Sequence, residues 1–290
     1  NPEEPAALDM AIKKAQETGA ELVLASDPDA DRIGIAVKDD KGEFILVNGN
    51  QIAMIFLNYL ITRYRELGRL TGNEYIVKTI VTTELIKNIA DKNNVKYFDC
   101  YTGFKWIAAV IRENEGKMKY IGGGEESYGF LAEDFVRDKD AVSACAILAE
   151  IAAWAKDQGI TMYQLLQNIY VQYGFSKEKG ISVVKKGKSG AEEIEAMMKH
   201  FRENPLQEIA GSKVTLFYDY ASLKGKDYVE NETLTLDMPT TSNVLQYFTE
   251  DGTKVSIRPS GTEPKIKFYC EVHSKVKSLD ELPAAEKAGA

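Results

Sequence analysis

Residues 74–124 read EYIVKTIVTTELIKNIADKNNVKYFDCYTGFKWIAAVIRENEGKMKYIGGG, and this stretch decides the fold class. Its short apolar runs at 74–81, 95–101 and 119–124 have the length and composition of buried strands. The two segments between these runs carry apolar residues at the spacing of helices. Strands that alternate with helices predict a layered α/β domain.

The flanking sequence extends this pattern upstream and changes it downstream. Upstream we expect, in order, a helix, three short strands and a long amphipathic helix (3–19, 21–25, 33–37, 42–47 and 51–67). A second long helix at 140–159 belongs to the same α/β part. From about residue 176, strand-like runs surround a single helix at 191–204, which predicts a separate α+β domain with mostly antiparallel strands. We expect the small, polar tail at 278–290 to fray.

Composition and charge narrow the classes of function. The 290 residues are enough for two or three cores, and a formal net charge of −8 argues against a general binder of nucleic acid or of anionic membranes. Three widely spaced cysteines without a CxxC pair argue against a disulfide framework and favour a reducing, cytoplasmic setting. The sequence predicts neither a signal peptide nor a membrane-spanning segment.

Three aspartates at alternate positions form the first candidate site. The stretch ASDPDADRIGIAV (residues 25–37) places Asp27, Asp29 and Asp31 between two apolar strand patterns. Carboxylates so close together repel one another, and coordination of a cation relieves that repulsion. Oxygen donors suit a hard divalent ion, which predicts a Mg²⁺ site, and Arg32 follows within reach of an anion. The alternative is a solvated acidic turn.

Two further loops contain residues suited to a sugar phosphate. IGGGEESYGF (121–130) follows a strand and lacks the spacing of nucleotide-binding glycine loops, but its Glu125, Glu126 and Ser127 suit sugar hydroxyls. SIRPSGTEPKIKFY (256–269) offers phosphate an arginine fork, two hydroxyls and a glycine that lets backbone N–H groups approach (Arg258, Ser260, Thr262 and Gly261). The alternatives are a tight turn for the first loop and an ordinary β-hairpin for the second.

Two lysines are weaker candidates. Lys105 in TGFK (102–105) and Lys139 in RDKD (137–140) could take part in acid–base chemistry or contact phosphate, although most such lysines are surface charges. The two histidines, His200 and His273, fit no metal or triad pattern.

The combination of these loops resembles the α-D-phosphohexomutase superfamily, and within it most closely the phosphoglucomutases. Asp-Pro-Asp-Ala-Asp-Arg at 27–32 is similar to the metal loop of that family, and Gly-Glu-Glu-Ser-Tyr-Gly at 124–129 to its sugar-binding loop. Arg-Pro-Ser-Gly-Thr-Glu at 258–263 is similar to its phosphate-binding loop. TGFK and RDKD also resemble stretches that line the family's cleft, so the resemblance spans nearly the whole chain.

The resemblance implies a fold and an activity. It implies the end of domain II at 1–47, domain III at 48–172 and an α+β domain IV, similar to the TATA-binding protein, at 173–290. It implies a Mg²⁺-dependent mutase that interconverts glucose 1-phosphate and glucose 6-phosphate through a phosphoserine and glucose 1,6-bisphosphate. The family's Ser-His-Asn-Pro loop, which bears that serine, is absent from these residues. We therefore expect a piece of a longer protein that is inactive alone.

The resemblance also assigns roles to the candidate residues. The metal ligands are Asp27, Asp29 and Asp31, and the catalytic candidates are Arg32, Lys105 and Lys139. The sugar is bound by Gly124, Glu125 and Ser127. The non-reacting phosphate is bound by Arg258, Ser260, Gly261 and Thr262.

Other interpretations remain open from the sequence. A phosphomannomutase or phosphopentomutase of the same superfamily is one, and a non-catalytic phosphosugar-binding module is another. A phosphatase of the haloacid dehalogenase type fits less well. Its Asp-x-Asp-x-Thr/Val motif needs threonine or valine where Asp31 stands, and it leaves the 258–263 loop unexplained.

Overall fold

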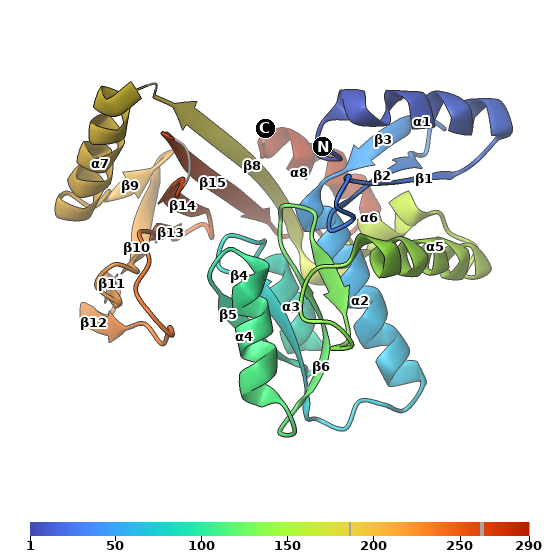
Figure 1. Cartoon of the computed structure of the whole chain (residues 1–290), viewed down its shortest axis with the longest axis horizontal. Coiled ribbons are helices and arrows are strands. Elements are labelled where there is room, and N and C mark those ends of the chain that lie inside the picture. The colour runs from blue at the N-terminus through green and yellow to red at the C-terminus, as the bar shows by residue number, and fades with distance from the viewer. Residues whose placement is uncertain (186, 262–263, 290) are drawn as a thin grey trace. The chain divides into compact units, whose positions relative to one another are not determined.

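A computed structural model describes residues 1–185, 187–261 and 264–289, apart from the side chain of Lys188 (Figure 1). The chain divides into two compact units. The first comprises Asn1–Phe175 and Val276–Pro283, and the second Ser176–Lys275 and Ala284–Ala290. Within the described residues, no helix combines the length and apolar character needed to cross a membrane.

The first unit begins with a helix packed on a small antiparallel sheet. The helix α1 (Pro5–Thr18) ends at Gly19, whose φ of 74° suits glycine. Its Leu8 and Ala15 share a core with residues of the sheet. The strands of this sheet follow one another in the order of the chain: β1 (Leu22–Ser26), β2 (Ile33–Lys38) and β3 (Phe44–Val47).

A four-stranded sheet of order β5-β4-β6-β7 forms the centre of the layered part. The parallel strands, whose carboxyl ends share one edge of the sheet, are β4 (Glu74–Thr79), β5 (Lys96–Cys100) and β6 (Lys119–Gly124). The short strand β7 (Phe130–Ala132) runs antiparallel to β6. These alternating strands and helices confirm the predicted layered α/β fold.

Helices cover both faces of this sheet. One face packs against α4 (Phe104–Asn114), whose Ile107 and Ile111 share a core with the strands. On the other face lies α2 (Gly49–Glu66), which begins with a capping box between Asn48 and Gln51. The remaining helices of this part are α3 (Leu85–Lys92), α5 (Ala141–Asp157) and α6 (Met162–Tyr173).

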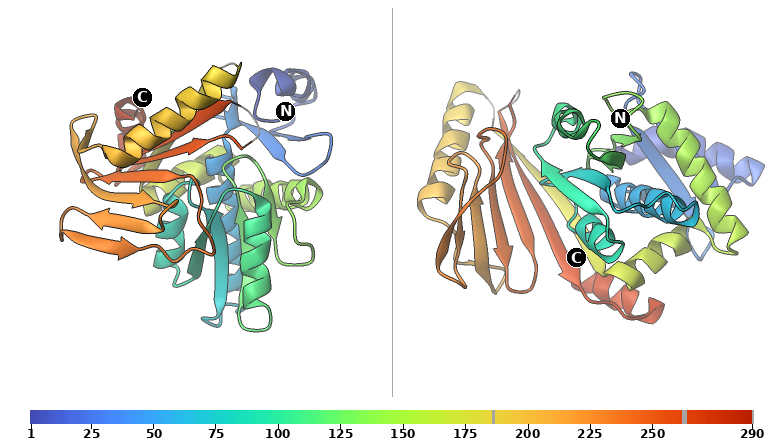
Figure 2. Two further views of the ribbon diagram at one scale, coloured as in Figure 1. Left: turned by 60° about the vertical axis from the view of Figure 1, so that its left-hand side comes forward. Right: turned by 90° about the horizontal axis from the view of Figure 1, so that it is seen from below.

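The second unit has the α+β character predicted for this part of the chain. Its main sheet has the order β12-β11-β10-β13-β14-β15-β8, and β9 adds to β10. The helix α7 (Gly187–Glu203) lies across one face of this sheet (Figure 2). The strands are β8 (Phe175–Val184), β9 (Glu208–Ile209), β10 (Ser212–Asp219), β11 (Lys224–Asp227), β12 (Glu232–Thr235), β13 (Leu245–Thr249), β14 (Lys254–Pro259) and β15 (Lys265–Ser274).

The prediction of a frayed tail was wrong. A 3-10 helix η1 (Leu279–Glu281) is followed by α8 (Leu282–Ala288). Leu282 and Ala285 lie about one turn apart and are buried. Burial of these apolar side chains stabilises the helix, although the composition of the segment is mostly small and polar.

Candidate functional site

The aspartate loop (residues 27–32) connects β1 to β2. The two strands pair antiparallel up to Ser26 opposite Ile33, so the loop closes the end of their ladder. Asp27, Asp29 and Asp31 each offer a carboxylate oxygen, and these atoms all lie within 4.8 Å of one another. Carboxylate oxygens are hard ligands, so this donor set fits a divalent cation such as Mg²⁺.

Asp27 gives the aspartate loop its shape. Its carboxylate accepts hydrogen bonds from the backbone N–H groups of Asp31 (3.0 Å) and Arg32 (2.9 Å). Ala30 turns the chain with a left-handed φ of 55°. Burial raises the pKa of Asp27, but the N–H groups of Arg32 and Asp31 outweigh it and bring the pKa below its ordinary value. Asp27 is therefore ionised at neutral pH, as a metal ligand must be.

Two of the three predicted basic residues lie at this loop. The ammonium Nζ of Lys139 is 3.1 Å from Oδ2 of Asp31. Arg32 places Nε 3.9 Å from Oδ1 of Asp31 and Nη1 3.1 Å from Oε1 of Glu3. The loop therefore combines cation ligands with positive charge that could attract a phosphoryl group.

Lys105 lies elsewhere. It is exposed in the first turn of α4, and its ammonium lies 5.2 Å from the centroid of the Trp106 ring. In the described part of the chain, the structure gathers Arg32 and Lys139 at the aspartates, but not Lys105.

The 125–129 turn connects β6 to β7 and contains two of the predicted sugar ligands. It closes on itself because the N–H of Glu125 donates to the carbonyl of Gly129 (2.9 Å), and the N–H of Tyr128 to the carbonyl of Glu125 (3.2 Å). The carbonyl of Tyr128 accepts a hydrogen bond from the N–H of Ile33 (3.0 Å), immediately after the aspartate loop. The predicted cation ligands and sugar ligands therefore belong to neighbouring segments of one unit.

The predicted sugar ligands differ in exposure. Gly124, the last residue of β6, is buried, Glu125 is also buried, and Ser127 is half-buried. Oε1 of Glu125 accepts a hydrogen bond from the N–H of Gly103 (2.6 Å). This bond joins the 125–129 turn to the TGFK stretch at the start of α4, so two loops at the carboxyl edge of the sheet are held together.

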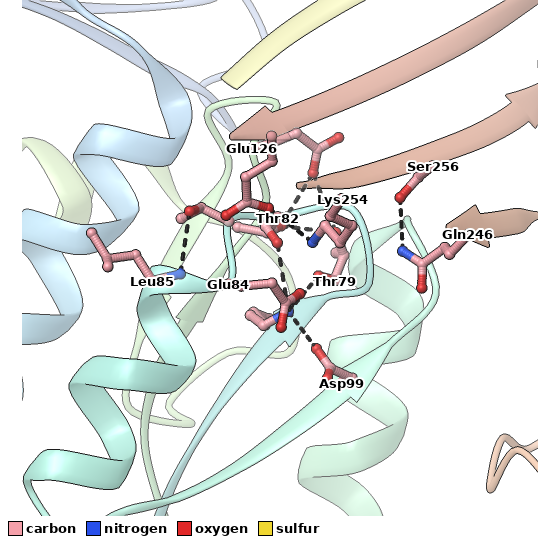
Figure 3. Close-up of polar contacts among 12 residues, drawn as sticks. Thr79, Thr82, Glu84, Leu85, Asp99, Glu126, Gln246, Lys254 and Ser256 are labelled. Atoms are coloured by element: carbon pink, nitrogen blue, oxygen red, sulfur yellow. Dashed lines mark hydrogen bonds and ion pairs between the residues drawn. The ribbon is translucent and has the colours of Figure 1, made fainter. Parts of the chain in front are cut away.

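Sequence reasoning counted Glu126, the second of the two adjacent glutamates, among the side chains suited to sugar hydroxyls and missed its contacts within the fold. Its side chain turns to the end of β4, where Oε2 lies 3.2 Å from the hydroxyl of Thr79 and 3.2 Å from that of Thr82 (Figure 3). Nothing in the sequence of the two adjacent glutamates distinguished Glu126 from Glu125.

Sequence reasoning also missed Lys78. Its side chain is fully buried, and its ammonium lies 2.7 Å from Oδ1 of Asp99 and 3.0 Å from Oε1 of Glu84. Burial lowers the pKa of Lys78, but the carboxylates of Asp99 and Glu84 outweigh it and raise the pKa above its ordinary value. A lysine inside the apolar run YIVKTIV was the signal.

The predicted phosphate ligands lie in the second unit. Arg258 is in β14 opposite Lys267 of β15, and the N–H of Ser260 donates to the carbonyl of Lys265 (2.8 Å) to close the loop. Arg258 and Ser260 are half-buried and Gly261 is exposed, whereas Thr262 lies outside the described residues. Beside this loop a cavity of about 310 Å³ is lined in part by Ile194, Met198, Asn243, Pro259, Ser260 and Lys265.

Comparisons with known proteins agree with these observations. Models of the phosphoglucomutase/phosphomannomutase family match three parts of the chain: domain II (alpha/beta/alpha) at residues 1–42, domain III (alpha/beta/alpha) at 48–173 and the C-terminal domain at 183–288. Curated phosphoglucomutases of Staphylococcus aureus are similar at the sequence level. The protein of strain MRSA252 is 40% identical to this chain over 282 residues, and that of strain USA300 is 39% identical over 282 residues. In both cases 97% of this chain aligns with 50% of the relative.

Solved structures show the same fold. Parafusin from Paramecium, described as a phosphoglucomutase, has a TM-score of 0.60 at 20% identity and aligns over 97% of this chain and 47% of its own. A putative phosphomannomutase from Thermus thermophilus has a TM-score of 0.61 at 18% identity and aligns over 100% of this chain and 51% of its own. The chain spans about half the length of the curated relatives that it matches. From the three domain matches together, the chain belongs to the phosphoglucomutase/phosphomannomutase family.

Proposed function

We propose that this chain supplies the metal-binding, sugar-binding and distal phosphate-binding parts of a Mg²⁺-dependent phosphohexose mutase. The observation that carries the proposal is the hydrogen bond from Ile33 to Tyr128 (3.0 Å), which joins the aspartate loop to the 125–129 turn. A cation site beside hydroxyl-reading side chains is what transfer of a phosphoryl group to a sugar requires. In this proposal the chain consists of the end of domain II (1–47), domain III (48–172) and domain IV (173–290).

The cation and the basic residues have separate roles in this proposal. Asp27, Asp29 and Asp31 hold Mg²⁺, which when bound polarises a phosphoryl group and stabilises developing negative charge. Arg32 steadies the transferring group. Lys139 neutralises Asp31 and can donate a hydrogen bond to phosphate, whereas Lys105 remains the weaker candidate for proton transfer.

The substrate is held at two ends. Glu125 and Ser127, with the backbone of Gly124, read ring hydroxyls of the sugar. The non-reacting phosphate is gripped by Arg258, Ser260, Gly261 and Thr262. We propose glucose 1-phosphate and glucose 6-phosphate as substrates, with glucose 1,6-bisphosphate as the intermediate, because the similar Staphylococcus aureus proteins are named phosphoglucomutases.

Binding and turnover give different tests. These 290 residues contain no Ser-His-Asn-Pro loop, so we expect the chain alone to bind glucose 1,6-bisphosphate in the presence of Mg²⁺ without turning over glucose 1-phosphate. Calorimetry measures the binding, and a coupled dehydrogenase assay with added glucose 1,6-bisphosphate measures the turnover. Appreciable turnover would contradict the proposal, because it would show that a residue of this chain serves as the nucleophile.

Variants separate the two ends of the site. Asp27→Ala should remove the Mg²⁺ dependence of binding, and Arg258→Ala should weaken bisphosphate binding at least tenfold, because a charge-assisted phosphate contact is lost. Lys213→Ala is the matched control, since Lys213 is an exposed cation of β10 in the same unit as Arg258. Tighter binding of mannose 1-phosphate or ribose 1-phosphate would favour a phosphomannomutase or phosphopentomutase. If Arg258→Ala binds as the wild-type chain does, the phosphate assignment fails.

A further inference from the structure

The side chain of Glu126 makes contacts inside the fold, whereas its neighbours are proposed to bind the sugar. It lies between Glu125 and Ser127 in the sequence, yet its carboxylate reaches the carboxyl end of β4 (Figure 3). There Oε2 meets Thr79 and Thr82, whose own hydroxyl oxygens are 2.8 Å apart. Both threonines are completely buried, so Glu126 contacts groups that are shielded from solvent.

Oε2 of Glu126 and the hydroxyl oxygens of Thr79 and Thr82 form a triangle of contacts that three protons would satisfy. Thr79 and Thr82 bring one hydroxyl proton each, while the three oxygens make three mutual contacts of 2.8, 3.2 and 3.2 Å. A protonated Glu126 adds the third proton, and each oxygen can then donate once and accept once. Burial and the neighbouring charge of Glu125 raise the pKa of Glu126, which favours that neutral form.

Backbone contacts hold the same turn from other sides. The carbonyl oxygen of Glu126 faces Gly49 so closely that a Cβ there would lie 1.9 Å away. The carbonyl of Tyr128 accepts from Ile33 (3.0 Å). Because consecutive Cα atoms are joined at about 3.8 Å, a fixed Glu126 limits the positions open to both Glu125 and Ser127.

We propose that Glu126 is a positioning residue: anchored to Thr79 and Thr82, it sets Glu125 and Ser127 to discriminate between epimers of the sugar ring. The inference rests on the proposed function of those two residues. Glu126 itself touches no substrate in this proposal. Its effect appears as selectivity between sugars that differ at one hydroxyl, which a purely structural glutamate would leave unchanged.

The test compares two epimers. Calorimetry with Mg²⁺ gives the dissociation constants of glucose 1-phosphate and galactose 1-phosphate, which differ only at the 4-hydroxyl, for the wild-type chain and for Glu126→Ala. We expect the wild-type chain to prefer glucose 1-phosphate and Glu126→Ala to lower that preference about tenfold. Glu126→Gln stays uncharged, and its amide nitrogen can donate to both threonine hydroxyls, so it should stay within about threefold of the wild-type preference. The double variant Thr79→Val with Thr82→Val should behave as Glu126→Ala does.

Glu150→Ala is the matched control. Glu150 also accepts a hydrogen bond from a hydroxyl, that of Tyr59 (2.6 Å), but it joins α2 to α5. This variant should keep the wild-type preference, and thermal melting identifies any variant that fails to fold.

The outcomes separate the inference from the proposed function. If the wild-type chain prefers glucose 1-phosphate and both Glu126→Ala and the double threonine variant keep that preference, the positioning role is refuted while the proposed function stands. If the wild-type chain binds neither sugar phosphate, the proposed function falls, and the inference falls with it.

Discussion

Replacement of Lys78 by methionine tests whether the ion cluster of Lys78, Glu84 and Asp99 stabilises the carboxyl edge of the four-stranded sheet. Methionine has a similar length and no charge, so Lys78→Met removes the ammonium with little change in volume. In the native protein this ammonium is 2.7 Å from Asp99 and 3.0 Å from Glu84, and the side chain is fully buried. Because its pKa is raised in the folded state, the stabilisation is fully present below about pH 10.4, the unfolded value, and is lost only as pH rises through the folded value.

The expected loss follows from the exposure of the two partners. Removal of one partner from a buried ion pair costs about 3–5 kcal/mol, because the other charge is left without compensation. The side chains of Asp99 and Glu84 remain 35% and 26% exposed, so water can solvate them in part. We therefore expect Lys78→Met to lose about 2–3 kcal/mol of the free energy of unfolding.

Urea denaturation at pH 7 measures this loss. With a slope of about 2.5 kcal/mol/M, the midpoint of the first unit should fall by about 1 M. The triple variant Lys78→Met, Glu84→Gln, Asp99→Asn removes the stranded charges and should recover most of the loss. A midpoint of Lys78→Met equal to or above that of the wild-type chain would refute the reasoning, as would a triple variant no more stable than Lys78→Met.

Three further predictions concern the cation site, the 125–129 turn and the second unit. Asp27→Asn can still accept the loop's N–H bonds through its amide oxygen but loses a charge, so the rise in melting temperature on adding MgCl₂ should shrink while the metal-free melting temperature changes little. Gly49→Ala places a Cβ 1.9 Å from the carbonyl oxygen of Glu126, so unfolding experiments should show a loss of about 1–3 kcal/mol, and calorimetry weaker sugar-phosphate binding. Burial lowers the pKa of His273, but its bond to Glu271 (3.0 Å) raises it overall, so this pair should stabilise the fold below about pH 6.5 and lose that effect as pH rises through the folded pKa. His273→Gln should therefore unfold at lower urea than the wild-type chain at pH 5.5, with a smaller difference at pH 9.

The elements were predictable because their signals are local. The apolar run before Asp27, the alternating strands and helices of residues 74–124 and the helical spacing at 191–204 all correspond to observed elements. One local prediction failed, and one strand was missed. The tail forms α8, because Leu282 and Ala285 are buried, and β11 (Lys224–Asp227) is a strand that its polar sequence KGKD does not reveal.

The candidate site was predictable in its ligands and less so in its geometry. Alternate spacing was enough to place Asp27, Asp29 and Asp31 together, because one short loop carries all three. The same spacing could not distinguish Lys139, which contacts Asp31 at 3.1 Å, from Lys105, which lies over Trp106. That difference depends on where the segment before α5 returns to the aspartate loop, and no local pattern encodes it.

The sequence by itself determined the periodicity of the elements and the chemistry of the loops, since both depend on residues close together in the chain. Only the tertiary structure decided that Ile33 bonds Tyr128, that Glu126 turns toward Thr79 and Thr82, and that Lys78 is charged inside a core. The physical reason is that strand order and burial arise from the whole unit, as strands compete for partners and every buried polar group needs a counterpart. Segments far apart in the chain meet only where that competition brings them together.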